Sequence, residues 1–146
     1  IKKDPNFGLP YKYLGEIRMA NRDLVKAIDC WEKFISLSPE ESYKVFDNME
    51  SALFDIGRYS EVEKFYRKVL EKDSKNIAGT LRLANVLNEK GEGHAAIKLI
   101  EGIINNGSNK ISILLMKLKL SLSIQTPNEL GHQIDMIINQ IENIDE

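Results

Sequence analysis

The sequence predicts an all-α protein, an α-solenoid of tandem helix-turn-helix repeats wound into a right-handed superhelix. Turn-forming residues recur at a period of about 34 residues, which is typical of stacked helical hairpins that need a neighbour to bury their apolar faces. Pro5 and Pro39 mark two successive steps of this period. The pairs Asp73-Ser74 and Gly107-Ser108 mark the next two. Each of them follows an apolar stretch with helical spacing.

Two series of large and small apolar residues share this period. Members of the first series recur once in each unit, at the same phase. Each member of the second lies four residues after its counterpart, on the same face of a helix. Two independent series in one phase support the repeat. The series are Ala27, Val62, Ala96 and Leu130, and Trp31, Tyr66, Ile100 and Ile134.

The first unit is expected to contain two helices. Apolar residues recur at helical spacing between Tyr11 and Ile17 and again between Leu24 and Ile35. The segment 21–23 (Asn-Arg-Asp) interrupts them. This pattern predicts a helix, a tight turn and a second helix.

The second unit breaks at the same phase, over residues 56–60. Gly57 can adopt the left-handed conformation that ends a helix. Ser60 and Glu63 have the spacing of a capping box, in which two side chains satisfy backbone N–H groups at the start of a helix. We therefore expect Ser60 to cap the second helix of this unit.

The third and fourth units break at residues 90–93 and 125–128, where Pro127 suits the first turn of a helix. No segment alternates with a two-residue period, so no strand is predicted. The last helix carries an apolar stripe that must be buried, and we expect it to cap the array. The stripe consists of Leu130, Ile134, Ile137, Ile138 and Ile141.

These breaks define one array of repeats. The opening segment 4–6 (Asp-Pro-Asn) shares the phase of the turn at Pro39, so residues 1–7 are expected to end a preceding repeat. The further boundaries are 8–41 for the first repeat, 42–76 for the second, 77–110 for the third, and 111–146 for a degenerate fourth repeat or C-terminal cap.

Composition argues against several classes of function. The 146 residues are 42% hydrophobic, which suffices for one domain or a short array. Charged residues make up 29% but leave a formal net charge of −2, so no basic field favours nucleic acid. No apolar run approaches the roughly 20 residues of a membrane span.

The residues that could carry chemistry are few and scattered. Cys30 is the single cysteine, and His94 and His132 lie far apart in the sequence, so no zinc-ligand spacing exists. His94 is expected at the start of a helix as a neutral surface residue, and Trp31 is expected in the core. No phosphate-binding loop or nucleophile elbow occurs. We expect no enzyme activity and no cofactor or metal in this chain.

The small, aromatic and proline positions of the first units resemble those of the tetratricopeptide repeat, abbreviated TPR. A small residue at Gly15 or Ala84 would let the two helices of a hairpin approach closely. Trp31 or Tyr66 would fill the space toward the next repeat. The matching positions are Leu14, Gly15, Ala27, Trp31 and Pro39, followed by Leu53, residues 57–59, Tyr66 and Leu70.

Some positions depart from the TPR pattern. Glu50 stands at the phase of Gly15 and Ala84, and Val62 replaces a small alanine. The fourth unit carries residues 117–118 (Lys-Leu) and Ser121 at its signature positions. The first three repeats are therefore predicted as regular and the fourth as degenerate.

Three segments are similar to the later repeats of the bacterial lipopolysaccharide assembly protein B family. They are KAIDCWEKFISLSP, GRYSEVEKFYRKVLEKD and LANVLNEKGEGHAAIKLIEGIINN. The resemblance implies a cytoplasmic adaptor, tethered to the inner membrane, that connects an ATP-dependent protease, its deacetylase substrate and assembly proteins. Family members have a membrane helix at the start and a zinc domain with two Cys-x-x-C pairs at the end, and we expect both to lie outside this chain.

The expected function is binding of a partner protein, peptide or helix. Stacked hairpins present the first helix of each unit on a concave groove. The apolar ends of the array could also pair with a second copy. The groove candidates are Lys12, Tyr13, Glu16, Met19, Lys44, Asp47, Asn48, Ser51, Arg82, Asn85, Asn88, Leu115, Met116 and Lys119.

Two alternatives stay within the repeat class. Chaperone-binding TPR domains hold the terminal carboxylate of an acidic peptide, and Lys12, Asn48 and Arg82 match three of their five polar positions. Glu16 and Ala78 replace the other two, and Glu16 is expected to pair with Lys12 and repel the ligand. A broader polar peptide groove is favoured over this clamp. The other alternative is the repeat region of a glycosyltransferase.

Overall fold

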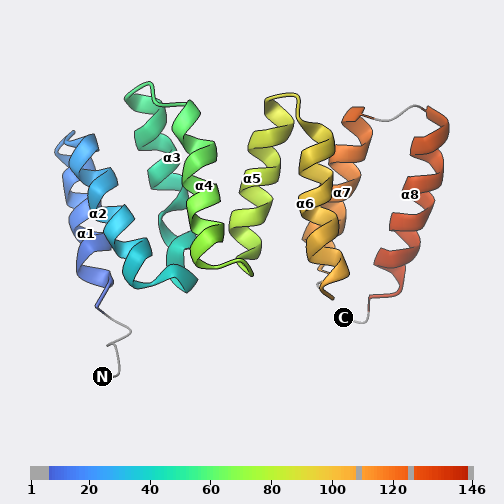
Figure 1. Cartoon of the computed structure of the whole chain (residues 1–146), viewed down its shortest axis with the longest axis horizontal. Coiled ribbons are helices and arrows are strands. Elements are labelled where there is room, and N and C mark those ends of the chain that lie inside the picture. Colours follow the sequence, from blue (N-terminus) through green and yellow to red (C-terminus); the bar gives the residue numbers. More distant parts are fainter. Residues whose placement is uncertain (1–6, 108–109, 125–126, 145–146) are drawn as a thin grey trace. The chain divides into compact units, whose positions relative to one another are not determined.

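In the computed structural model, residues 7–107, 110–124 and 127–144 are described, and this part of the chain is built from helices without a strand (Figure 1). The predicted all-α class is confirmed. The first four α-helices are α1 (Leu9–Ala20), α2 (Leu24–Leu37), α3 (Phe46–Asp55) and α4 (Ser60–Lys72), with the 3₁₀ helix η1 (Pro39–Val45) before α3. The others are α5 (Ile77–Glu89), α6 (Gly93–Asn105), α7 (Ile111–Ile124) and α8 (Pro127–Glu142).

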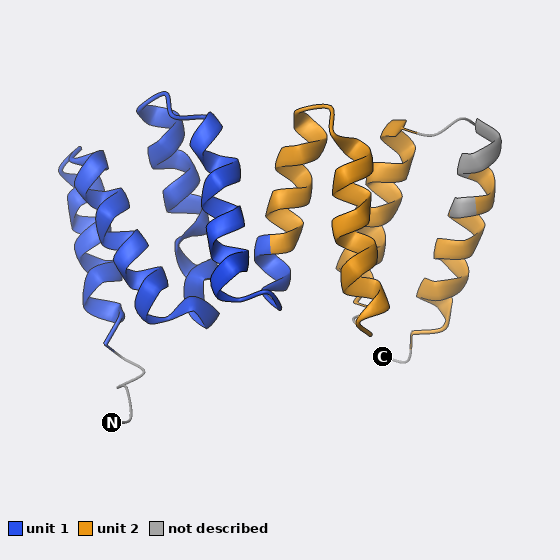
Figure 2. Ribbon diagram, in the orientation of Figure 1, with its two compact units in different colours: residues 1–79 blue, residues 80–146 orange. Residues whose placement is uncertain are grey.

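The chain divides into two compact units (Figure 2). Unit 1 comprises residues 1–79 and contains α1 to α4. Unit 2 comprises residues 80–146 and contains most of α5 and all of α6 to α8. In each unit, consecutive helices form hairpins joined by short turns.

Three hairpin turns have the same backbone design. Arg22, Gly57 and Gly91 are in the left-handed region, with φ of 62°, 73° and 85°, and they stand at the same phase of successive units. The residue after each donates its N–H to a carbonyl five residues back, as Asp23 does to Arg18 at 2.9 Å. This pattern satisfies the last carbonyls of the first helix. The left-handed conformation predicted for Gly57 is confirmed, and Arg22 adopts it without being glycine.

Helices α1 and α2 approach closely because Gly15 has no side chain. A Cβ atom at Gly15 would lie 2.2 Å from Nε1 of Trp31. The indole is fully buried and donates a hydrogen bond to the carbonyl of Lys12 at 3.3 Å. The core position of Trp31 is confirmed, and its ring covers the glycine of its own hairpin.

The second hairpin replaces this pair with a polar one. Glu50 and Tyr66 occupy the phases of Gly15 and Trp31, and the Tyr66 hydroxyl donates a hydrogen bond to Oε1 of Glu50. The tyrosine ring is fully buried and meets Phe46 edge to face at 5.1 Å between centroids. The departure of Glu50 from the TPR pattern is thus matched by a hydroxyl on the facing helix.

Two buried polar residues, Asn76 and Ser42, join the end of unit 1 to the 3₁₀ helix η1. Asn76 precedes α5 and accepts a hydrogen bond from the N–H of Gly79 at 2.8 Å, which caps the helix. Its amide donates to Oγ of Ser42 at 2.8 Å. Both side chains are buried, so each bond satisfies a group that water does not reach.

Two details of the sequence interpretation are wrong. Ser60 is the first residue of α4 and makes no capping hydrogen bond, because the preceding Tyr59 is already in the helical conformation. Glu63 instead accepts a hydrogen bond from Arg67 at 2.9 Å. In α8 only part of the predicted stripe is buried, with Ile137 at 2% exposure and Ile138 at 42%.

Some expectations fall outside the described residues. They concern the closing turn at residues 4–6, the turn residues 125–126 and the side chain of Leu130.

In the first three units the predicted series are confirmed as core. Ala27, Trp31, Val62, Tyr66, Ala96 and Ile100 are all buried.

Candidate functional site

A hollow in unit 1 lies beside the first helices of the first two hairpins. It has a volume of about 470 Å³ and is lined by residues of α1, of the turn after α1, of the start of α2 and of α3. Three of the predicted groove residues, Glu16, Met19 and Asn48, line it. The remaining lining residues are Ala20, Arg22, Leu24 and Asp55.

Glu16, which lines the hollow, forms an ion pair with Lys12. Nζ of Lys12 is 2.6 Å from Oε1 of Glu16, one turn further along α1. The same ammonium lies 4.6 Å from the centre of the Tyr13 ring. The predicted pairing of Glu16 with Lys12 is confirmed. Glu16 therefore occupies the ammonium group that an acidic ligand would need.

The 3₁₀ helix η1, which precedes α3, carries a similar pair. Nζ of Lys44 is 2.7 Å from Oε1 of Glu41, and this hydrogen bond raises the pKa of Lys44 above its ordinary value. Burial lowers the pKa of Lys44 in part, and the negative charge of Glu41 adds to the rise. Tyr13 and Tyr43 are each 55% exposed, so both rings are available to a partner.

The other predicted residues of α3 differ in exposure. Asn48 is half-buried, whereas Asp47 and Ser51 are exposed. Asn48 therefore combines an amide donor and acceptor with a partly enclosed position in the hollow.

In unit 2 two predicted residues, Asn85 and Lys119, bind one another, and a third, Asn88, binds Ser123. Nζ of Lys119 donates to Oδ1 of Asn85 at 3.3 Å, and Oγ of Ser123 donates to Oδ1 of Asn88 at 3.1 Å. These bonds join α5 to α7 along one face. Asn85 also donates to Oε1 of Glu89 at 3.1 Å. Asn85 thus uses both its amide nitrogen and its amide oxygen within the protein, and Asn88 uses its amide oxygen.

The remaining candidates of unit 2 are one cation and two apolar residues. Arg82 and Met116 are half-buried, and Leu115 is 50% exposed. A partner of this face would meet apolar surface on α7, whereas a partner of unit 1 would meet charged, amide and aromatic groups.

Sequence reasoning missed four residues that line the hollow. Ala20 and Asp55 are the last residues of α1 and α3, Arg22 lies in the turn after α1, and Leu24 is the first residue of α2. The groove prediction covers the middle of the first helices and therefore leaves out turn residues. A usable signal was the phase of Arg22, which matches Gly57 and Gly91 and so marks the left-handed residue of a turn.

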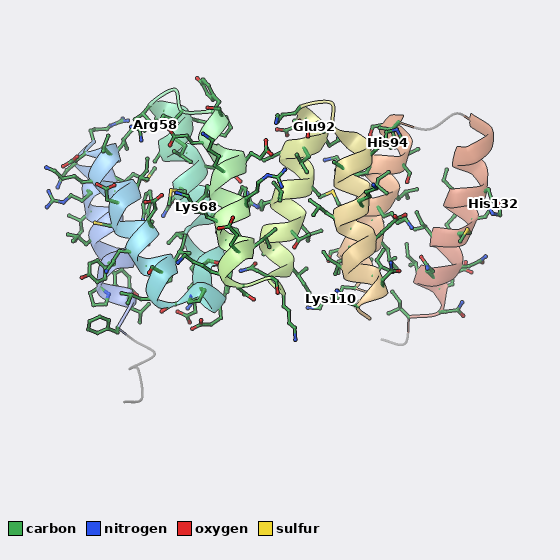
Figure 3. The ribbon with its side chains drawn as sticks, viewed as in Figure 1. Arg58, Lys68, Glu92, His94, Lys110 and His132 are labelled. Carbon is green, nitrogen blue, oxygen red and sulfur yellow. The ribbon has the colours of Figure 1, made fainter. Side chains whose placement is uncertain are left out.

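The chemistry of the hollow suits binding. Within the described residues no group of three histidine, cysteine, aspartate or glutamate side chains could hold a metal ion. The two histidines lie on different helices, His94 on α6 and His132 on α8 (Figure 3). The lining combines two carboxylates, one guanidinium, one amide and three apolar side chains, which can hold a side chain of mixed polarity.

Neither a protein-family model nor a curated protein matches this chain. Solved structures do match it. The crystal structure of MamA protein has a TM-score of 0.64 and 20% identity, over 97% of this chain and 76% of that one. The TPR2B domain of yeast Sti1, in its complex with pHsp70, has a TM-score of 0.55 and 20% identity, over 80% of this chain and 98% of that one.

A third similar structure is YrrB, a TPR protein with an unusual peptide-binding site. It has a TM-score of 0.61 and 11% identity, over 96% of this chain and 72% of that one. At these identities the likeness concerns the fold. The chain has the fold of tetratricopeptide repeat proteins.

Among the described residues, no helix is both long and apolar enough to cross a membrane.

Proposed function

We propose that this chain is a non-enzymatic interaction module that binds a partner peptide on the first-helix face of unit 1. The hollow of about 470 Å³ beside α1 and α3 carries this proposal. Two similar structures, Sti1 in its complex with pHsp70 and YrrB with its peptide-binding site, support a peptide as the partner. The TPR fold is well suited to this function because tandem hairpins offer an extended binding surface.

The lining of the hollow indicates how a peptide would be held. Asn48 can donate to and accept from a peptide backbone, while Met19 and Leu24 contact the apolar part of a side chain. Tyr13 and Tyr43 add exposed aromatic surface, which commonly anchors partners. We therefore expect an extended peptide that inserts one side chain into the hollow.

The test uses a pair of matched substitutions. Ala20→Trp fills the hollow from an exposed position, and Ala95→Trp places the same side chain on an exposed position of α6. Peptides are selected from a random display library against the unmodified chain, and their Kd is measured on both variants. We expect Ala20→Trp to raise Kd at least about tenfold, since the anchor loses its pocket. Equal Kd on the unmodified chain and Ala20→Trp, or loss of binding only on Ala95→Trp, would contradict the proposal.

The carboxylate clamp is the narrower alternative. Its first cation, Lys12, is held by Glu16 at 2.6 Å, which weighs against it. Titration with acidic C-terminal peptides tests it, and Arg82→Glu should abolish binding if the clamp exists. Equal affinity of the two proteins would eliminate it.

The adaptor hypothesis in lipopolysaccharide assembly, with a cytoplasmic location at the inner membrane, rests on the sequence resemblance. The parent reading frame tests it. An upstream membrane helix and two downstream Cys-x-x-C pairs support the adaptor, and a frame without either would remove it.

A further inference from the structure

A second surface of unit 1 lies between α2 and α4, the second helices of the two hairpins, and Met49 and Leu53 of α3 line part of it. Two adjoining hollows of about 90 and 160 Å³ share Glu32, Phe65 and Lys68. Ile28 and Phe65 belong to the first hollow, and Ile35, Phe65 and Val69 to the second. We call this surface the outer groove.

A row of lysines follows the α4 side of the outer groove. Lys64, Lys68 and Lys72 are spaced at i, i+4 and i+8, so they share one face of the helix. All three are exposed, and Nζ of Lys68 reaches from α4 to within 3.9 Å of Oε1 of Glu32 on α2. Figure 3 labels Lys68 on α4. The row presents positive charge along an apolar floor.

The carboxylates of the outer groove are already opposed by cations. Glu32 faces Lys68, and Oε1 of Glu61 lies 3.7 Å from Nε of Arg58. Within the part of the chain that the structure describes, Lys64 and Lys72 have no carboxylate within ion-pair distance. The groove therefore has a surplus of positive charge at both of its ends.

We propose that the outer groove binds an acidic amphipathic helix of a partner protein. A helix of about three turns rises roughly 16 Å and presents side chains four residues apart on one face. Its carboxylates at that spacing match the lysine row, and its apolar side chains enter the two hollows. This surface shares no residue with the first-helix hollow, so it would serve a second partner.

The test measures binding of a synthetic helical peptide with glutamates at every fourth position and leucines on the adjoining face. A peptide with lysines in place of the glutamates is the probe control. Lys64→Glu/Lys72→Glu reverses the unpaired charges of the groove, and Lys98→Glu/Lys110→Glu makes the same change of net charge in unit 2. Circular dichroism verifies that each variant is folded.

We expect the glutamate peptide to bind, and Lys64→Glu/Lys72→Glu to raise its Kd at least about tenfold. The Kd should increase with salt, because exposed charges are screened. Lys98→Glu/Lys110→Glu should leave the Kd within about twofold. The lysine peptide should not bind.

A substitution of opposite effect sharpens the test. Glu32→Gln removes the carboxylate that faces Lys68, so it should tighten binding of the glutamate peptide about threefold. Glu142→Gln makes the same chemical change on α8 and should have no effect.

Several outcomes would overturn the proposal. Absence of binding, equal weakening by both double variants, or weakening only by Ala20→Trp would each exclude the outer groove as the site. Sedimentation of the free protein tests whether a second copy of the chain occupies the groove instead. If the chain self-associates and Lys64→Glu/Lys72→Glu disperses it, a second copy occupies the groove and the proposal fails.

Discussion

Three residues set the geometry of the first hairpin. Gly15 admits the Trp31 indole, and Arg22 closes the turn in the left-handed conformation at φ 62°. The small and aromatic positions could be predicted from the TPR pattern. The conformation of Arg22 could not, because local residue preference favours glycine there and only the repeat phase points to it.

The Gly15 position has a direct test. Gly15→Ala should lower the free energy of unfolding by about 2 kcal/mol, because the new Cβ meets the indole while alanine's better helix propensity recovers only part of the cost. Trp31 is the single tryptophan, so its fluorescence reports the change as a shift to longer wavelength. Trp31→Phe in the same chain should reduce the cost of Gly15→Ala. A cost that is the same in both backgrounds would contradict the contact.

Arg22 is expected to store strain. Arg22→Gly should raise the free energy of unfolding by about 1 kcal/mol, since a left-handed residue with a Cβ costs about that much. Gly57→Ala, at the same phase of the second hairpin, should lower it by about 1 kcal/mol. Urea unfolding measures both. A lower free energy of unfolding for Arg22→Gly would contradict this prediction. It would show that the arginine side chain stabilises the fold by more than the left-handed backbone destabilises it.

Cys30 offers a pH-dependent prediction. Burial raises the pKa of the Cys30 thiol, Arg18 lowers it in part, and Asp29 raises it. The thiolate therefore forms at higher pH than for a free cysteine, and alkylation by iodoacetamide should show a pH midpoint above the ordinary value. Asp29→Asn should lower the midpoint, and Glu32→Gln should leave it unchanged. A midpoint at or below that of the unfolded chain would contradict the prediction.

At the level of elements, helix ends were the hardest part to predict. The turn at Gly57 has the expected left-handed conformation, and Gly91, at the same phase of the next unit, adopts it as well. The predicted cap at Ser60 is wrong, because the chain before it is already helical. The cap at Asn76 was not predicted, although its bond to the Gly79 N–H is local. The second bond of Asn76 could not be predicted, since its partner Ser42 lies 34 residues away and only the fold brings them together.

The Asn76 cap can be measured by a double-mutant cycle. Asn76→Ala removes the bond to the Gly79 N–H and leaves the Ser42 hydroxyl buried, so we expect a loss of about 2 kcal/mol in the free energy of unfolding. Ser42→Ala alone should cost less. The two losses should be non-additive, because the residues share a hydrogen bond. Additive losses would mean that the bond contributes nothing.

For the whole molecule, the sequence predicted the helical repeats and three of the residues that line the hollow of unit 1. The period and the apolar series carry that information because each hairpin buries the same face. Pairings such as Lys119 with Asn85, or the enclosure of Asn48 in a hollow, depend on side chains from neighbouring repeats. Residue type alone does not determine them, and neither does it determine which partner binds.

The central claim is that the first-helix face of unit 1 binds a peptide. The most direct measurement is the backbone amide spectrum of isotope-labelled protein, recorded while a display-selected peptide is added. We expect the largest shifts at Met19, Arg22, Asn48 and Asp55, which line the hollow. Shifts confined to α6 to α8, or the same shifts with a peptide of scrambled sequence, would contradict the claim.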